Sequence, residues 1–323
     1  MRRPVAERKL ISIVTPCYNE ELNVEACYQV VRGLFEKDLA RYDYEHIFCD
    51  NCSTDSTVEK LRALAAADKR VKVILNARNF GPLRSNYNGV MATRGDGVLV
   101  FLPADLQDPP ELIPEFVHKW EEGYDVVRGV RKKRQESFLM AAVRKVYYRM
   151  ASRLASIDLP KDVGDFQFVD KKLIEALRRF DDYYPYLRGM LASCGFKTYS
   201  IEYTWRTRAR GFSKNRLYHL IDQGLNGMIS FANLPMRLCM FLGFGVSAVS
   251  LLYAFGTFCY IAYERLFRGV EIAPAGIPTL IVAIFFFGGV QLFFLGVLGE
   301  YISAIHFQVR KRPLVVEKER INF

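Results

Sequence analysis

Residues 98–111 read V-L-V-F-L-P-A-D-L-Q-D-P-P-E, and this stretch decides the fold class. Its apolar beginning is typical of a buried strand, and its polar end carries the carboxylates of Asp105 and Asp108 around the amide of Gln107. In an open α/β sheet, the carboxyl ends of strands border the ligand-binding crevice. Carboxylate and amide oxygens suit a hard cation such as Mg²⁺ or Mn²⁺. Taken alone, the stretch is also compatible with a solvated turn whose aspartate caps a helix.

Short apolar runs alternate with helix-like segments along the first half of the chain. We predict strands at residues 10–15, 44–49, 71–75, 98–102 and 125–127. This alternation indicates an α/β fold with a mostly parallel sheet, in which the loops after the strands converge on one edge. The polar groups expected at that edge are residues 16–20, Asp50, residues 79–81 and residues 105–108. The chain has no G-x-G-x-x-G and no G-x-x-x-x-G-K-[ST] sequence, which argues against a dinucleotide-binding fold and a P-loop.

The composition combines a basic net charge with a strong asymmetry along the chain. The 323 residues carry a formal net charge of +10, and half of them are hydrophobic. This charge favours anionic partners such as phosphates or acidic lipids. The seven cysteines have no disulfide spacing, which indicates free thiols in a reducing compartment, and the pair Cys49 and Cys52 lacks the second pair of a zinc site. The basic residues 1–10 have no apolar core behind them and do not read as a signal peptide.

Basic residues cluster with aromatic ones from residue 128 onward. A solvated surface is the ordinary interpretation for most of them, but a phosphorylated ligand would need some, because an arginine can hold a phosphate with two hydrogen bonds. The clusters are Arg128, Arg131, Lys132, Lys133 and Arg134; then Arg144, Lys145, Arg149 and Arg153, on a helix predicted at residues 138–157; and then Arg206, Arg208, Arg210, Lys214 and Arg216.

The last third of the chain has the pattern of a membrane domain. Residues 238–263 and 272–299 contain no charged residue, and each run is long enough for the ~20 apolar residues that span a bilayer. We predict two transmembrane helices there, preceded by an interfacial amphipathic helix at residues 217–229, for which a core helix or an oligomer contact is the alternative. Arg237 before the first run and the basic residues at positions 310–312 after the second predict that both termini and the α/β domain are cytoplasmic.

Taken together, these stretches resemble glycosyltransferase family 2, which has the Rossmann-like GT-A fold, and within it the polyprenyl-phosphate glycosyltransferases. The matching sequences are I-V-T-P-C-Y-N-E-E, C-D-N-C-S-T-D-S-T, R-N-F-G, A-D-L-Q-D-P-P-E, G-V-R-K-K-R, V-G-D-F and R-A-R-G-F-S-K, and the two apolar runs resemble the bacterial undecaprenyl-phosphate branch. The resemblance implies a cytoplasmic GT-A domain at residues 1–210 and a juxtamembrane amphipathic segment at 211–235. It also implies two transmembrane helices within residues 236–304 of the inner membrane, and a cytoplasmic basic tail at 305–323.

The resemblance implies a reaction as well as a fold. A sugar would pass from a nucleotide sugar, with UDP-glucose or another UDP-hexose as the leading candidate, to polyprenyl phosphate, with Mg²⁺ or Mn²⁺ as cofactor. The anomeric carbon would invert, and the product would serve cell-envelope glycans such as lipopolysaccharide. The acceptor is already an anionic nucleophile, because the second phosphate pKa is about 6. A homotetramer has precedent in the family.

The resemblance also implies roles for individual residues. Asp105 would bind the metal, with Gln107 as a further ligand, and Asp165 would orient the acceptor or act as a base at the reacting centre. Asp105, Asp165 and Arg131 are therefore the candidate catalytic residues. The candidate nucleotide-binding residues are Pro16, Tyr18, Glu20, Asp50, Asn79, Gly81 and Ala104. The candidate contacts to the acceptor phosphate are Arg131, Arg144, Arg208, Ser213 and Lys214.

Three places depart from the family pattern. Pro103 replaces the first aspartate of D-A-D-L-Q, Asn51 and Cys52 stand where Asp-Gly is common, and Gln167 stands where an arginine often follows the phenylalanine. The missing carboxylate at position 103 removes one potential metal ligand. It therefore leaves open an alternative, a catalytically impaired membrane-anchored protein that binds nucleotide sugars without turnover.

Two other classes of protein fit the sequence less well. A processive polysaccharide synthase would carry a Q-x-x-R-W motif, which neither Trp120 nor Trp205 completes. A nucleic-acid-binding protein would account for the basic charge, but the basic residues flank a membrane region and form no nucleic-acid-reading motif. We therefore expect nucleotide sugar, polyprenyl phosphate and membrane as partners, and no nucleic acid.

Overall fold

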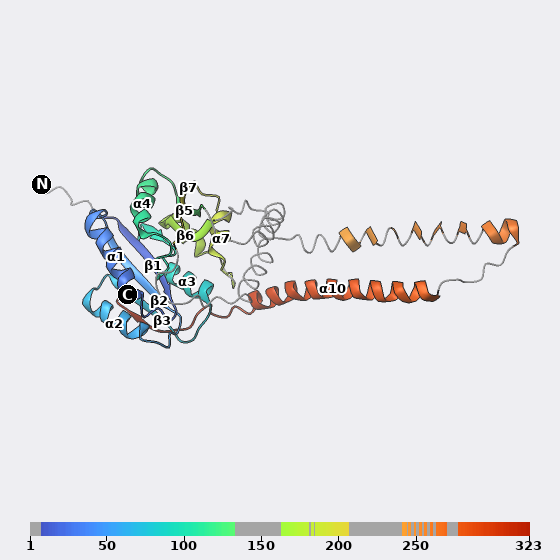
Figure 1. Cartoon of the computed structure of the whole chain (residues 1–323), viewed down its shortest axis with the longest axis horizontal. Coiled ribbons are helices and arrows are strands. Elements are labelled where there is room, and N and C mark those ends of the chain that lie inside the picture. The colour runs from blue at the N-terminus through green and yellow to red at the C-terminus, as the bar shows by residue number, and fades with distance from the viewer. Residues whose placement is uncertain are drawn as a thin grey trace. The chain divides into compact units, whose positions relative to one another are not determined.

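Figure 1 shows a computed structural model of the chain, which describes residues 8–132, 163–180, 182–183, 185–206 and 277–323 and part of 241–269. The chain divides into two compact units. The first unit contains the sheet and includes Lys311–Phe323 at the C-terminus. The second unit contains Phe231–Arg310.

The first unit is built on a mixed sheet. In the described part of the chain this sheet has eight strands, in the order β7-β5-β6-β4-β1-β2-β3-β8. The strands are β1 (Leu10–Cys17), β2 (Asp43–Asp50), β3 (Val71–Asn76), β4 (Gly97–Leu99), β5 (Val126–Arg131), β6 (Val163–Asp170), β7 (Thr198–Tyr203) and β8 (Glu317–Ile321). Parallel pairs join β1 to β2 and β4, β2 to β3, and β5 to β7, whereas β6 and β8 run antiparallel to their neighbours. The predicted α/β class and the five predicted strands are confirmed, and β6, β7 and β8 are additional.

Helices pack on this sheet through apolar stripes. The clearest case is α1 (Val24–Lys37), where Val24, Cys27, Val31 and Phe35 are buried at intervals of three or four residues. The other described helices of this unit are α2 (Thr57–Ala67), α3 (Pro82–Met91), α4 (Ile113–Glu121), α6 (Lys171–Leu177) and α7 (Leu187–Ser193), with a 3-10 turn at Pro110–Leu112. α3 packs against β1 and β2, and α4 against β5 and β6.

His46 lies in the middle of β2 and is fully buried. Its Nε2 atom lies 2.9 Å from the hydroxyl of Thr15 on β1, and its ring centroid lies 4.0 Å from that of Phe48. Burial lowers the pKa of His46 from 6.5 to about 3, because the imidazolium ion would lose its hydration. Between about pH 3 and pH 6.5, His46 is therefore neutral in the folded chain and charged in the unfolded chain.

We expect moderate acid to destabilise the fold through His46. As the pH falls below 6.5, the unfolded chain binds a proton that the folded chain takes up only near pH 3, so stability drops by about 1.4 kcal/mol per pH unit in this window. Denaturant unfolding at several pH values measures the slope for the wild-type protein and for His46→Gln. The variant should be less stable at neutral pH and should lose less stability on acidification, and equal slopes would contradict this origin.

The C-terminal segment returns to the sheet as β8, which pairs antiparallel with β3. The side-chain amide of Asn322 donates to the carbonyl oxygens of Ala65 and Val71 at 2.7 and 2.8 Å. β8 therefore covers the edge of β3, whose backbone groups would otherwise be open to pairing with another chain. Residues 305–323 were predicted only as a basic tail, so this strand is a feature that the sequence analysis missed.

The second unit contains the long helix α10 (Ile277–Val309). Its part Phe286–Val309 is the one helix in the described ranges that is long and apolar enough to cross a membrane, and its side chains are not buried within the protein. The prediction of two spans is not confirmed, because the first predicted span, at residues 238–263, falls on positions that are only partly described. The helices predicted at residues 138–157 and 217–229 lie outside the described residues.

Candidate active site

The parallel strands of the first unit bring their loops to one edge of the sheet, as predicted. β1 and β2 end in register, with Cys17 opposite Asp50. The chain after β4 stays beside β1, because the backbone N–H of Leu102 donates to the carbonyl of Val14 at 2.8 Å. It then enters the loop of residues 103–108. We call this end of the parallel strands, with the loops after β1 to β4, the carboxyl edge.

Three loops at the carboxyl edge each contain a residue with a left-handed backbone. Asn19 has a φ of 54° after β1, Cys52 a φ of 66° after β2, and Leu106 a φ of 54° after β4. Residues other than glycine adopt this conformation rarely, and such strain concentrates at functional sites. Gly81, with a φ of 87°, precedes α3 in the loop after β3, where only glycine is free of this strain.

Hydrogen bonds fix the loops after β1 and β2 to each other. The backbone N–H of Asn19 donates to the hydroxyl of Ser53 at 2.8 Å, and that of Glu20 donates to the hydroxyl of Thr57 at 2.8 Å. Tyr18, between these anchored positions and β1, has 38% of its surface exposed. The backbone around Tyr18 is thus fixed, and part of the residue is exposed to solvent.

Asp50 lies at the end of β2 with its carboxylate held in place. The backbone N–H of Ser53 donates to it at 3.0 Å, and the hydroxyl of Ser53 donates to its other oxygen. Burial raises the pKa of Asp50, and the hydrogen bonds from Ser53 oppose that rise. Because each carboxylate oxygen can accept more than one hydrogen bond, this geometry is compatible with a further donor from a ligand.

Three asparagines connect the loops after β2 and β3. The amide of Asn51 donates to the side-chain oxygen of Asn79 at 2.8 Å and accepts from Asn76 at 3.2 Å. The same Asn51 oxygen accepts from the backbone N–H of Phe80 at 2.9 Å, and the Asn79 oxygen accepts from that of Gly81 at 2.9 Å. Asn51 was identified only as a departure from the family pattern, but the structure shows that it shapes the loop carrying the predicted residues Asn79 and Gly81.

The loop of residues 103–108 carries the predicted metal ligands. One oxygen of Asp105 accepts from the backbone N–H of Gln107 at 3.3 Å. Gln107 is tied to the segment after β7, because its carbonyl accepts from the backbone N–H of Arg206 at 3.0 Å and its side-chain amide donates to the Arg206 carbonyl at 3.4 Å. The structure therefore places Asp105 and Gln107 in one turn, supported from β7.

The donors in this turn fit a hard cation in kind. Asp105 and Gln107 supply a carboxylate and an amide, and Mg²⁺ commonly takes one or two protein oxygens and fills its other positions with water and substrate phosphates. The part of the chain that the structure describes contains no group of three His, Cys, Asp or Glu residues able to hold a metal alone. The two residues therefore fit a cation that is shared with a diphosphate.

Asp108, at the end of the same loop, has only 1% of its side chain exposed and is bound to two other elements. Its oxygens lie 3.0 and 3.3 Å from Nη2 of Arg131 on β5. The hydroxyl of Tyr203 on β7 donates to the same carboxylate and accepts from Nε of Arg131 at 3.1 Å. Burial, and then the charge of Asp108, raise the pKa of Tyr203, so the phenol stays protonated and donates. Arg131 thus joins β5, β7 and this loop, while its predicted contact to a phosphate stays a prediction.

Asp165 on β6 is paired with a cation from α7. Nε of Arg188 lies 2.8 Å from its Oδ1, and Nη1 of Arg188 donates to the carbonyl of Val163 at 3.1 Å. Gln167, which was noted as a departure from the family pattern, is buried and donates to the carbonyl of Gly164 at 3.0 Å. No sequence motif links Arg188 to Asp165, since the two residues lie on different elements, α7 and β6.

The remaining predicted positions divide into two groups. Pro16 lies in β1, and Ala104, which is 4% exposed, lies in the loop after β4, so both belong to the carboxyl edge. The predicted acceptor-phosphate contacts Arg144, Arg208, Ser213 and Lys214 lie outside the described residues. Their roles stay predictions.

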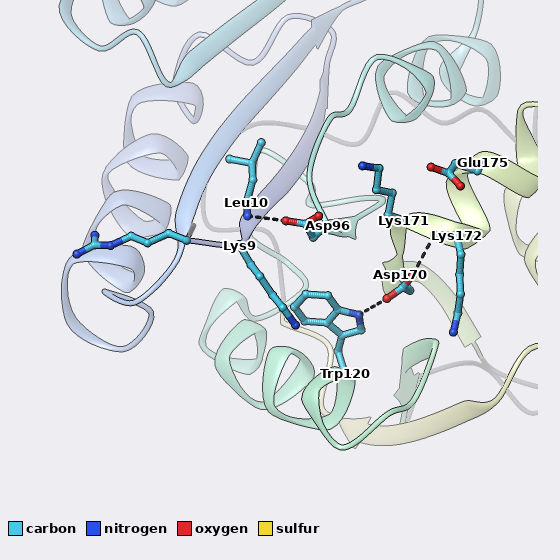
Figure 2. Close-up of a pocket in the computed structure, with 9 residues that line it drawn as sticks. Lys9, Leu10, Asp96, Trp120, Asp170, Lys171, Lys172 and Glu175 are labelled. Carbon is cyan, nitrogen blue, oxygen red and sulfur yellow. Dashed lines mark hydrogen bonds between the residues drawn. The ribbon is translucent and has the colours of Figure 1, made fainter. Parts of the chain in front are cut away.

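A cavity of about 630 Å³ lies at the opposite end of β1 (Figure 2). The ammonium group of Lys9 lies 4.6 Å from the ring centroid of Trp120, whose indole N–H donates to Asp170 at 2.7 Å. Asp96 accepts from the backbone N–H of Leu10 at 3.0 Å. These groups bind one another and hold the start of β1, so we assign this cavity a structural role.

Comparison with known proteins places this geometry in a family. The profile of Glycosyl transferase family 2 matches residues 12–178. Bacillus subtilis (strain 168) YkcC, described as an uncharacterized glycosyltransferase, is 37% identical over 306 residues, which are 94% of this chain and 92% of the relative. A bactoprenol glucosyl transferase derived from the SfII prophage of Shigella flexneri is 32% identical over 310 residues, which are 96% of this chain and 97% of the relative.

Solved structures show a more distant likeness. Glucosyl-3-phosphoglycerate synthase of Mycobacterium tuberculosis, in complex with Mn²⁺, UDP and glucosyl-3-phosphoglycerate, is 20% identical with a TM-score of 0.45, over 68% of this chain and 78% of that one. The family profile, in contrast, spans β1 to α6 and so includes every loop of the carboxyl edge. The chain belongs to glycosyltransferase family 2, and it is a glycosyltransferase.

Proposed function

We propose that this glycosyltransferase transfers a sugar from a nucleotide sugar to polyprenyl phosphate, a phosphorylated membrane lipid. The observation that carries the proposal is the match to a bactoprenol glucosyl transferase over 96% of the chain, which extends past the carboxyl edge into α10. Because α10 is apolar enough to enter a membrane, one chain combines a glycosyltransferase site with an element suited to the environment of a lipid acceptor.

In this proposal the sheet domain has a GT-A fold, and its carboxyl edge binds the nucleotide. The ring of Tyr18 stacks on the base, and Asp50 accepts a hydrogen bond from the uracil or the ribose. Glu20 and Pro16 border the same pocket, and the loop with Asn79 and Gly81 closes its far side. The hydrogen bonds among these loops support this assignment, since a preorganised site loses less conformational entropy when it binds a ligand.

The diphosphate of the donor lies in this proposal at Ala104 and Asp105. A divalent cation bound at Asp105 and Gln107 would neutralise the charge that develops on the leaving nucleoside diphosphate. The small side chain of Ala104 would let the backbone approach the diphosphate closely, and Asp105 is oriented by the backbone N–H of Gln107. Pro103 leaves this turn with one carboxylate fewer than the family pattern, so Asp105 carries the negative charge for the cation at this turn.

The acceptor phosphate attacks the anomeric carbon directly in the proposed reaction. Its second pKa of about 6 makes it largely a dianion at neutral pH, so no side chain has to remove a proton. Asp165 then acts by orienting the acceptor, and its ion pair with Arg188 keeps it fixed. A single displacement of this kind inverts the anomeric configuration. We propose UDP-glucose as donor, an inner-membrane location with the sheet domain in the cytoplasm, and a homotetramer.

Transfer of radiolabelled sugar tests this function. The full chain in detergent is incubated with undecaprenyl phosphate and a panel of UDP- and GDP-sugars, with Mg²⁺, with Mn²⁺ or with a chelator. We expect label in the lipid from one UDP-hexose, and loss of that label with the chelator. Label in the lipid from a GDP-sugar alone would contradict the UDP assignment, and equal labelling with the chelator would contradict the role of the metal.

Pro103 motivates one other candidate function, a membrane-anchored protein that binds nucleotide sugars without turnover. It predicts that UDP-sugars raise the melting temperature of the chain while no donor in the panel labels the lipid. Melting curves recorded on the same protein samples as the transfer assay separate the two functions. Labelled lipid above the level of an Asp105→Ala control would exclude the binding-only alternative.

A further inference from the structure

A second cavity, of about 320 Å³, lies beside the loop that follows β3. It is lined from three parts of the first unit that are distant in the sequence, which are residues 77–84, Tyr183 and residues 312–316. The return of β8 to the sheet assembles it, because the backbone N–H of Ala77 donates to the carbonyl of Val316 at 2.9 Å. We call this cavity the arginine pocket, after its lining residues Arg78, Arg84 and Arg312.

The described lining of the arginine pocket carries charge of one sign. Among the described residues that line it there are three arginines and no Asp or Glu. The cavity at the amino end of β1 has four basic and three acidic lining residues and is therefore nearly balanced. The difference indicates that the arginine pocket attracts an anion, whereas the other cavity does not.

Two arginines of the pocket are held flat against aromatic rings. The guanidinium carbon of Arg78 lies 4.0 Å from the ring centroid of Phe80, and that of Arg84 lies 4.0 Å from the ring centroid of Tyr183. Stacking of this kind restrains the guanidinium plane and directs its N–H groups sideways. Fixed, planar donors of this kind match the oxygens of a phosphate, which they can bind with two hydrogen bonds.

The position of Arg312 in the chain indicates where such a phosphate comes from. α10 ends at Val309, only three residues before Arg312. A chain extends by at most ~3.6 Å per residue, so Arg312 lies within about 11 Å of the end of that helix. If α10 spans a bilayer, the length of the chain alone keeps Arg312 near the end of the spanning helix and so near the lipid headgroups.

We propose that the arginine pocket binds the phosphate group of an anionic membrane lipid. The chemistry is a phosphate that carries a lipid chain, and it is supplied by a phospholipid such as phosphatidylglycerol or by polyprenyl phosphate itself. The site is distinct from Asp105 and Asp165, and its occupation fixes residues 77–84, which include the loop with Asn79 and Gly81. The proposal concerns lipid binding alone, so it can fail or hold independently of the sugar-transfer reaction.

Native mass spectrometry of the full chain in a non-ionic detergent counts the lipids that it retains. Separate titrations use phosphatidylglycerol, undecaprenyl phosphate and zwitterionic phosphatidylcholine. We expect one anionic lipid per chain to bind at least about tenfold more tightly than phosphatidylcholine, since one charge-assisted contact is worth roughly that factor. The anionic lipid with the higher affinity identifies the source of the phosphate.

The double variant Arg84→Gln/Arg312→Gln should lose this binding by about tenfold or more. Its matched control is Arg310→Gln/Lys318→Gln, which removes the same charge from positions that are close to Arg312 in the sequence and do not line the pocket. Arg84→Lys/Arg312→Lys keeps the charge and should bind with intermediate affinity, and melting curves identify any variant that fails to fold. Equal losses in the two Gln double variants would overturn the proposal in favour of general attraction by basic residues. Displacement of the lipid by inorganic phosphate or UDP at matched concentration would overturn it in favour of a soluble anion.

Discussion

Asp105→Ala is expected to lower kcat for sugar transfer by on the order of a thousandfold or more. Asp105 supplies the negative charge of a turn in which Pro103 stands in place of the other aspartate of the family pattern. Among the described residues of that turn, the next acid is Asp108, which is buried and cannot replace Asp105. The loss should appear in kcat rather than only in the KM for the donor, because the charge on the leaving diphosphate develops in the transition state. Initial rates with the active donor, at saturating Mn²⁺ and over a range of donor concentrations, give both constants.

Two further variants separate the charge of Asp105 from its shape. Asp105→Asn keeps an oxygen that can accept from the backbone N–H of Gln107 at the observed 3.3 Å, so the turn should persist. It lacks the negative charge and should be nearly as inactive as the alanine variant. Gln107→Ala removes one neutral donor and should cost less, about tenfold. An Asp105→Asn enzyme with wild-type kcat would show that the charge of this residue is not used.

Asp108→Ala is expected to destabilise the protein by about 3–5 kcal/mol, because it leaves Arg131 as a charge inside the protein without its carboxylate. It also deprives the hydroxyl of Tyr203 of its acceptor. Denaturant unfolding monitored by tryptophan fluorescence suits this measurement, since Trp205 stacks 4.9 Å from the Arg131 guanidinium.

Tyr203→Phe is the matched control for this cluster. It removes one hydroxyl from the same site and keeps the ion pair of Asp108 with Arg131, so we expect a loss of only about 1–2 kcal/mol. The double variant Asp108→Ala/Arg131→Met removes both charges and should recover part of the stability lost by Asp108→Ala. If Asp108→Ala unfolds at the same denaturant concentration as the wild type, the cluster does not stabilise the fold.

The strands that could be predicted from the sequence are those with a local signal. β1 and β3 are largely apolar or β-branched runs, and β2 has such a run only in its second half, after Glu45 and His46. All three strands end in polar loops, and an apolar run of this kind is most often a buried strand. β6 alternates polar and apolar residues around V-G-D-F and was noticed as a motif rather than as a strand. β8 reads E-K-E-R-I, and its strand depends on β3 beside it, since its own residues carry almost no apolar pattern.

The candidate site was predictable in its position and less so in its contacts. Tyr18, Asp50 and Asp105 lie at the ends of parallel strands, so the backbone alone places them at one edge of the sheet. The network of Asn51 was not predictable, because an asparagine in place of an aspartate was interpreted as a lost acid, whereas its amide both donates and accepts. For Arg131, a basic motif predicted a contact to a phosphate. The structure shows that Arg131 also has a buried carboxylate partner, Asp108.

The return of β8 to the sheet has a consequence for how the chain threads a bilayer. β7 and β8 belong to one sheet, so the chain leaves this sheet after Tyr203 and rejoins it at Glu317. A unit that lies wholly on one side of a bilayer can be left and rejoined only by an even number of crossings. If α10 crosses once, the chain between Tyr203 and α10 has to cross an odd number of times. A membrane-spanning α10 would therefore belong to an even number of crossings.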